Sequence, residues 1–361
     1  MTATSASPTL LWYIPNTVEP GHRGDDVTTG WADLELIAEL AGIAERHGWS
    51  GALLGTGWGR PDTLTIATAL AARTTTFRPL AAIRPGYWQP APFASAAATL
   101  DHLSGGRLLV NVVSGTDDAG AYGDDVTTNP RRYARTAEFM QLVRRLWEEE
   151  DVTFSGEYYW VKSSTLPLRP ARRPTLYFGG ASPAAERVAA EHADVQLFWG
   201  EPLDGVAQRI ARLGALAARA GREHPPLEFG LRITTVARAT ADEAWEVAEQ
   251  KVAAMAGAAG QLDETPAGRG WAAAAGQQRL QSLAQRGEVL DSCLYTAPAR
   301  FGGQGAATTW LVGSFDEVAD ALAKYAALGI SHFILSDTPY KAEAARAGDE
   351  LLPRLRARWP A

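Results

Sequence analysis

The feature that most constrains the fold is an alternation of apolar strands and amphipathic helices along nearly the whole chain. Eight segments rich in aliphatic and aromatic residues are each followed by a segment with helical periodicity. These segments are continuously apolar, which is typical of strands buried on both faces in a parallel sheet. The predicted strands lie at 10–15, 51–56, 79–85, 107–115, 175–180, 195–200, 229–237 and 332–337.

Eight strand–helix repeats in 361 residues favour a (β/α)8 TIM barrel of class α/β over a doubly wound sheet, which would need a reversal of strand order. We therefore expect a single barrel domain over residues 1–361. The helices are expected at 32–47, 62–75, 92–103, 131–149, 183–192, 203–220, 241–258, 315–329 and 341–357.

Two segments interrupt the alternation and are predicted to be insertions. Residues 151–174 have the pattern of a short hairpin followed by a loop rich in Pro and Arg. Residues 259–310 carry little periodic apolar pattern and are rich in Gly, Ala and Gln. Long loops in compact domains usually act as lids or partner surfaces, so we expect a lid over the C-terminal face of the barrel.

Composition narrows the functional class. The net charge is −7 and the arginines are scattered, which argues against a nucleic-acid partner. One cysteine, Cys293, excludes an internal disulfide, and neither a signal peptide nor a membrane span is evident, so we expect a cytoplasmic protein. The six histidines show no metal-ligand spacing, and no metal is expected.

In a TIM barrel the active site lies at the C-terminal ends of the strands. The predicted ends carry small polar residues, Arg84, Arg232 and Trp199, with no carboxylate that is well placed as a base. Neither a GxSxG elbow nor a GxGxxG fingerprint follows a strand, which argues against acyl transfer and a Rossmann site. Hydroxyls and arginines without an acid–base pair indicate that a cofactor supplies the chemistry.

The turn YFGGAS at residues 177–182, followed by Pro183, is the strongest local candidate for an anion site. Ser182 suits an N-cap and Pro183 the first helical position. Gly179 and Gly180 would allow the backbone to approach a ligand at the helix N-terminus, where phosphate is favoured. A capped strand–helix turn without a ligand explains the same residues equally well.

From about residue 10 to residue 355 the chain resembles the bacterial luciferase-like flavin-dependent monooxygenases, and within them the alkanesulfonate monooxygenase group. The segments that carry the resemblance are LWYIP, ATLDHLSGGRLLVNVVSGTD (98–117), RRYARTAEFMQLVRRLW (131–147), LYFGGAS (176–182), LFWGEP (197–202), FGLRITTVARATADEAW (229–245), GQQR (276–279) and YAALGISHFILSDTP (325–339).

The resemblance implies a barrel with a mobile loop and a two-component system. An NAD(P)H-dependent flavin reductase would supply reduced FMN, which would react with O2 and convert an alkanesulfonate to an aldehyde and sulfite. A homodimer or homotetramer is the family expectation. The implied flavin contacts are Asn111, Val113, Ser114, Tyr133, Gly179, Gly180, Ala181 and Ser182, with Ala181 in place of a family serine.

On the substrate side, the resemblance assigns Arg232 and Arg300 to an anionic substrate and to developing negative charge, which suits the guanidinium fork. Trp199 matches an active-site tryptophan, and Tyr340 is a candidate proton donor. The chain departs from the family pattern at four polar positions. The family's His, Cys, Tyr and His fall on Thr234, Arg60, Thr338 and a position near Thr17.

These departures leave several functions open. The enzyme could oxygenate a different, for example biosynthetic, substrate with reduced FMN. The same fold could bind the deazaflavin F420 and transfer hydride without oxygen. A flavin-binding relative without catalytic activity is the third alternative.

Overall fold

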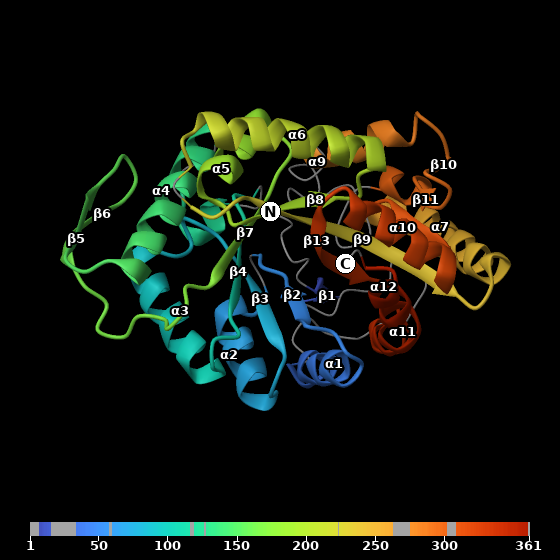
Figure 1. Cartoon of the computed structure of the whole chain (residues 1–361), viewed down its shortest axis with the longest axis horizontal. Coiled ribbons are helices and arrows are strands. Elements are labelled where there is room, and N and C mark those ends of the chain that lie inside the picture. Colours follow the sequence, from blue (N-terminus) through green and yellow to red (C-terminus); the bar gives the residue numbers. More distant parts are fainter. Residues whose placement is uncertain are drawn as a thin grey trace.

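The computed structural model describes most of the chain: residues 7–15, 34–57, 60–115, 119–125, 128–222, 224–262, 275–301 and 308–359. Parallel strands form a closed ring at the centre, and helices surround it (Figure 1). The barrel strands are β1 (Thr9–Ile14), β2 (Gly51–Leu54), β3 (Arg78–Ile83), β4 (Leu109–Val112), β7 (Thr175–Gly179), β8 (Val195–Trp199), β9 (Glu228–Arg238) and β13 (Ile330–Ser336).

Closure of this ring confirms the predicted (β/α)8 barrel. Each strand pairs in parallel with the next along the chain, β8 pairs with β9, and β13 returns to β1 with Leu11 opposite Ile334. All eight predicted strands occupy positions in the ring. A doubly wound sheet would leave two open edges, whereas here the eight strands have none within the described barrel.

The helices of the repeats lie outside the ring. They are α1 (Leu34–Arg46), α2 (Thr63–Arg73), α3 (Pro90–Ser104), α4 (Asn129–Glu148), α5 (Pro183–His192), α6 (Leu203–Arg219), α7 (Ala241–Leu262) and α10 (Phe315–Ala327). The expected last helix at 341–357 is divided into α11 (Tyr340–Arg346), a π-helical turn (Ala347–Leu351) and α12 (Leu352–Ala357). Pro353 accounts for the break, because proline has no N–H to donate to the preceding turn.

Two apolar layers explain why the strands are apolar throughout. Side chains alternate across a strand, so Leu11 and Tyr13 of β1 point into the barrel. Leu10, Trp12 and Ile14 of the same strand pack outward against the helices. Each strand is therefore buried on both faces, as the sequence predicted.

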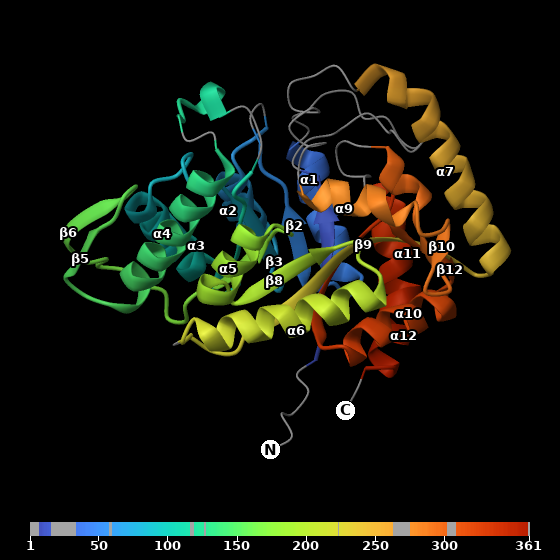
Figure 2. The ribbon, with the colours of Figure 1, turned by 90° about the horizontal axis from the view of Figure 1, so that it is seen from above.

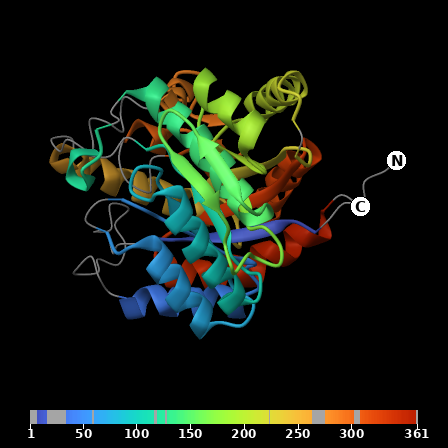
Figure 3. The same ribbon diagram turned by 90° about the vertical axis from the view of Figure 1, so that its left-hand side faces the viewer.

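The first insertion is the predicted hairpin. It consists of β5 (Val152–Ser155) and β6 (Trp160–Ser164), paired antiparallel and lying outside α4 (Figure 3). Glu138 of α4 holds its turn by accepting hydrogen bonds from the backbone N–H groups of Glu157 and Tyr158 at 2.7 and 2.9 Å.

The second insertion has more regular structure than the sequence pattern indicated. The structure there contains α9 (Ala275–Leu283), the short strands β10 (Val289–Leu290) and β11 (Leu294–Tyr295), and a 3-10 turn η2 (Ala297–Arg300). A strand that the sequence analysis missed, β12 (Trp310–Ser314), pairs with the second half of β9 and joins the insertion to the barrel. Residues 263–274 and 302–307 lie outside the described residues, so the lid function remains a prediction.

Strand direction places the candidate site opposite the chain ends. The start of β1 and the end of α12 lie on one side of the molecule, and the C-terminal ends of the strands open on the other (Figure 2). No helix in the described part of the chain is long and apolar enough to cross a membrane. Within the same residues, no group of three or more His, Cys, Asp or Glu side chains is arranged to hold a metal ion.

Candidate active site

The turn after β7 is built around a close approach of strand and helix. Ser182 is the N-cap of α5 and accepts a hydrogen bond from the backbone N–H of Ala185 at 3.2 Å, with Pro183 at the first helical position. Gly180 has φ +153°, and a Cβ there would lie 2.5 Å from the Cβ of Ala185. Gly180 is therefore required by packing of the helix onto the turn, whether or not a ligand binds.

The same turn presents donors suited to a phosphate. The hydroxyl of Tyr133, from α4, lies 4.0 Å from the position a Cβ on Gly180 would take. The Ser182 hydroxyl and the N–H of Ala184 lie at the same helix end, where the helix dipole favours an anion. Pro183 has no N–H, and the N–H of Ala185 is bonded to Ser182. Ala181 is half-buried and contributes only backbone. These groups fit a phosphate monoester such as that of FMN.

β4 contributes two inward side chains and one that turns away. Asn111 is 9% exposed and lies in register with Ala82 and Tyr177 of the neighbouring strands. Val113 packs on the apolar cluster inside the barrel. Ser114 turns toward α4, and its hydroxyl lies 2.8 Å from that of Thr136. Of the three predicted flavin contacts on this strand, Asn111 and Val113 thus face the interior.

A buried network of ion pairs, which the sequence analysis did not predict, contacts the glycine turn after β7. Arg209 of α6 is 2% exposed and donates to the Gly180 carbonyl at 2.6 Å, to Glu186 at 3.0 Å and to Glu201 at 3.0 Å. Arg279 of α9 donates to both carboxylate oxygens of Glu201 at 2.6 and 2.7 Å. The network therefore connects the second insertion to the glycine turn. Its only signals in the sequence are the FWGEP and GQQR segments.

Burial and ion pairing act in opposite directions on Glu186. Burial opposes ionisation of its carboxyl, but hydrogen bonds from Arg212 and Arg209 hold its pKa below the usual range. Glu186 is therefore ionised at neutral pH and neutralised by two guanidinium groups at the start of α5. Because the Glu186 carboxylate is paired with these guanidinium groups, it does not repel an anion bound at the start of α5.

Two strands along the wall from β7, Arg232 of β9 lies over an aromatic ring. Its guanidinium lies 4.5 Å from the centroid of the Tyr13 ring. The Tyr13 ring in turn lies 6.3 Å from the ring of Tyr340, at the start of α11. A guanidinium stacked on a ring keeps its donor edge free for an oxyanion. The structure thus places Arg232 and Tyr340 on either side of Tyr13, a residue that the alternation of side chains along β1 could have identified.

Hydroxyl groups surround this cluster at the ends of β9 and β13. Thr234 is fully buried, and its hydroxyl lies 3.2 Å from that of Ser336. The Thr338 hydroxyl is buried without a hydrogen-bond partner among the described residues. Lys251 of α7 anchors this end of β13 by donating to Asp337 at 2.7 Å and to the Thr338 carbonyl at 2.6 Å.

Trp199 lies next to the second insertion, and Arg300 lies within it. Trp199 packs against Leu280, Leu283 and Ala299, below α9. Arg300 is exposed at the end of η2, beside a segment outside the described residues. The structure does not bring Arg300 to Arg232, so its predicted role stays a prediction. Thr17 also lies outside the described residues.

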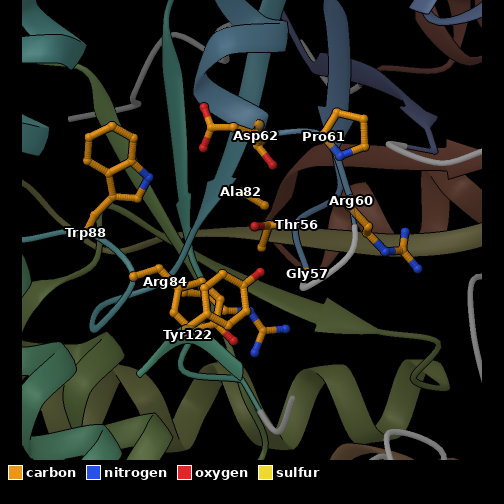
Figure 4. Close-up of a pocket in the computed structure, with 11 residues that line it drawn as sticks. Thr56, Gly57, Arg60, Pro61, Asp62, Ala82, Arg84, Trp88 and Tyr122 are labelled. Carbon is orange, nitrogen blue, oxygen red and sulfur yellow. The ribbon is translucent and has the colours of Figure 1, made fainter. Parts of the chain in front are cut away.

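A cavity of about 710 Å³ opens at the C-terminal ends of β2 and β3 (Figure 4). Arg84, which follows β3 and is 8% exposed, lies beside the Tyr122 ring. The Tyr87 and Tyr122 rings are stacked with an interplanar angle of 12°. The lining residues are Thr56, Gly57, Arg60, Pro61, Asp62, Thr63, Ala82, Arg84, Tyr87, Trp88 and Tyr122. Its volume and flat aromatic walls suit a planar ring system.

The helix end at Ser182, the buried arginines and the aromatic walls at the mouth of the (β/α)8 barrel are compatible with a phosphorylated planar cofactor. The family model described as luciferase-like monooxygenase matches residues 10–332. The chain therefore belongs to the luciferase-like monooxygenases and is an enzyme of the flavin-dependent monooxygenase class.

Solved structures of similar fold include three with different reactions. A riboflavin lyase matches with a TM-score of 0.77 at 22% identity, covering 98% of this chain and 92% of that chain. A long-chain alkane monooxygenase matches with a TM-score of 0.76 at 17% identity, covering 99% and 93%. The EDTA monooxygenase of Chelativorans sp. BNC1 matches with a TM-score of 0.76 at 19% identity, covering 98% and 94%. At these identities the matches establish the fold and not the substrate.

Proposed function

We propose that the protein is the oxygenating component of a two-component monooxygenase. An NAD(P)H-dependent flavin reductase would supply reduced FMN, and the substrate would be a small organic anion, with an alkanesulfonate as the leading candidate. The observation that carries this proposal is the Arg232 guanidinium of β9, which lies over the Tyr13 ring, two strands along the barrel wall from the glycine turn.

Three groups of residues would divide the work. Tyr133, Ser182 and the N–H of Ala184 would hold the FMN phosphate, with Asn111 and Val113 lining the cofactor. Arg232 would bind the anionic substrate and stabilise negative charge that develops on it. Tyr340 would deliver a proton at the mouth.

When bound, reduced FMN supplies two electrons and activates O2. For an alkanesulfonate RCH2SO3⁻, the C–S bond breaks and the carbon becomes an aldehyde. One oxygen atom of O2 enters the aldehyde, and the other leaves as water. Sulfur would depart as hydrogen sulfite, and the two electrons that the flavin supplies would complete the reduction of the second oxygen atom to water.

The test is sulfite release in air by the protein with FMN, NADH, a flavin reductase and catalase. Sulfonates of one to ten carbons would be compared, and the Arg232→Met variant serves as a matched control. Sulfite that peaks at one chain length and disappears in the variant supports the proposal. Tight binding of reduced FMN without sulfite from any sulfonate would reject the sulfonate, and oxygenated products of other anions would then be sought.

Two further outcomes separate the alternatives. Substrate oxidation or reduction under argon that depends on F420 and not on FMN would replace oxygenation by hydride transfer. Reduced flavin also reacts with O2 in the absence of protein. If the protein binds flavin but O2 is consumed no faster than by free reduced flavin, the protein is a relative without catalytic activity.

A further inference from the structure

Arg84 is a buried cation that the proposed reaction does not yet use. Side chains alternate along β3, so Ala82 and Arg84 both point to the interior side of the barrel wall and line the same cavity. The Arg84 guanidinium lies 5.5 Å from the centroid of the Tyr87 ring, and the side chain is 8% exposed. A charge at such a depth interacts strongly with a ligand, because water screens it poorly.

The absence of a side chain at Gly115 leaves room for this guanidinium. It follows β4, has φ +63°, and a Cβ there would overlap Nη1 of Arg84. The arginine therefore lies flat against backbone that has no side chain. Its conformation is set before any ligand binds, which reduces the entropy that binding would cost.

The position of Arg84 relative to the glycine turn matches the shape of FMN. In the barrel wall β7 neighbours β4, and β4 neighbours β3. Neighbouring strands lie about 4.8 Å apart, so the turn after β7 and the end of β3 are separated by roughly 10 Å along the wall. A phosphate at Ser182 and a ribityl chain across β4 would place the ring system in the cavity beside Arg84.

We propose that Arg84 faces the pyrimidine edge of the bound flavin and makes the protein select reduced over oxidised FMN. This inference rests on the proposed function. Reduced flavin at neutral pH carries a negative charge shared by N1 and the C2 carbonyl oxygen, whereas the oxidised ring is neutral. A guanidinium forms charge-assisted hydrogen bonds with that edge only in the reduced form. An enzyme that receives reduced flavin from solution and releases oxidised flavin needs this discrimination.

The experiment compares dissociation constants for oxidised FMN in air and reduced FMN under argon. Loss of one charge-assisted hydrogen bond predicts that Arg84→Met lowers the preference for reduced FMN by about 10- to 100-fold. For a two-electron couple this equals a fall of roughly 30–60 mV in the midpoint potential of the bound flavin. Arg84→Lys keeps the charge and is expected to recover part of the preference.

Two further variants separate the position of the Arg84 guanidinium from the total charge of the protein. Gly115→Ala displaces the guanidinium without removing its charge, and is expected to lower the preference in the same direction. Arg73→Gln removes a charge from α2, where the Arg73 side chain is 55% exposed, pairs with Glu35 and does not line the cavity. It is expected to change the preference by less than about threefold. Circular dichroism and thermal unfolding confirm that each variant is folded.

The outcomes separate this inference from the proposal beneath it. Wild-type protein that binds FMN in neither redox state would overturn the proposed function and this inference with it. If the protein binds FMN but Arg84→Met leaves the preference for reduced FMN unchanged, or Arg73→Gln lowers it equally, the role of Arg84 alone is overturned.

Discussion

Replacing Glu201 by Gln is expected to lower both the free energy of unfolding and the affinity for FMN. The Glu201 carboxylate is 2% exposed and accepts hydrogen bonds from Arg209 and Arg279. The amide keeps the shape but removes the charge, and so leaves the Arg209 guanidinium, which is 3% exposed, with one carboxylate fewer.

The magnitude follows from the burial of each partner. Breaking a buried ion pair from one side costs about 3–5 kcal/mol, because the other charge stays in the interior without its partner. Arg209 also bonds to Glu186, so we expect the lower end, about 3 kcal/mol. Arg279 is 36% exposed, and its loss in Arg279→Gln is expected to cost only about 0.5–1 kcal/mol.

Urea unfolding of the wild type, both single variants and the double variant measures these differences and their coupling. FMN affinity is measured on the same samples, because Arg209 also holds the Gly180 carbonyl. A cost below about 1 kcal/mol for Glu201→Gln, or equal costs for the two single variants, would refute the view that burial of the network determines its strength.

Three further predictions follow from the site and its surroundings. Arg232→Met is expected to reduce kcat/KM for an anionic substrate by about 30- to 100-fold, with FMN affinity changed by less than about threefold; an equal loss with an uncharged substrate would contradict the assignment. Gly180→Ala is expected to cost about 1–3 kcal/mol in urea unfolding, because its Cβ would lie 2.5 Å from that of Ala185. The control Gly214→Ala, in an exposed part of α6 with nothing within 4 Å of the new Cβ, should instead stabilise by about 0.4–1 kcal/mol. Burial, with the nearby His224 and Arg144, lowers the pKa of His192 to about 4. The unfolded chain therefore binds this proton more readily than the folded protein does. The free energy of unfolding should fall by up to about 3 kcal/mol as the pH drops from about 6.5 to about 4, and by less in His192→Gln. Parallel plots of unfolding free energy against pH for the two proteins would reject this cause.

Local periodicity is enough to place the barrel strands but not the structures that depend on distant partners. Each barrel strand is an apolar run followed by a helical pattern, and both signals lie within a few residues of each other. The short strand β12 was missed because its five residues carry no pattern without β9 beside them. The last helix was predicted as continuous because its helical periodicity persists beyond Pro353.

The candidate site shows the same division. The sequence alone determined the fold class, the strand ends that face the mouth, and the glycine turn with Ser182 as a helix cap. Only the tertiary structure decided that Arg232 stacks on Tyr13, that Arg209 supports Gly180, and that Arg84 lies against Gly115. These residues are far apart along the chain and meet because the barrel closes. Periodicity reports the face on which a side chain lies, whereas closure of the sheet determines which side chain it meets.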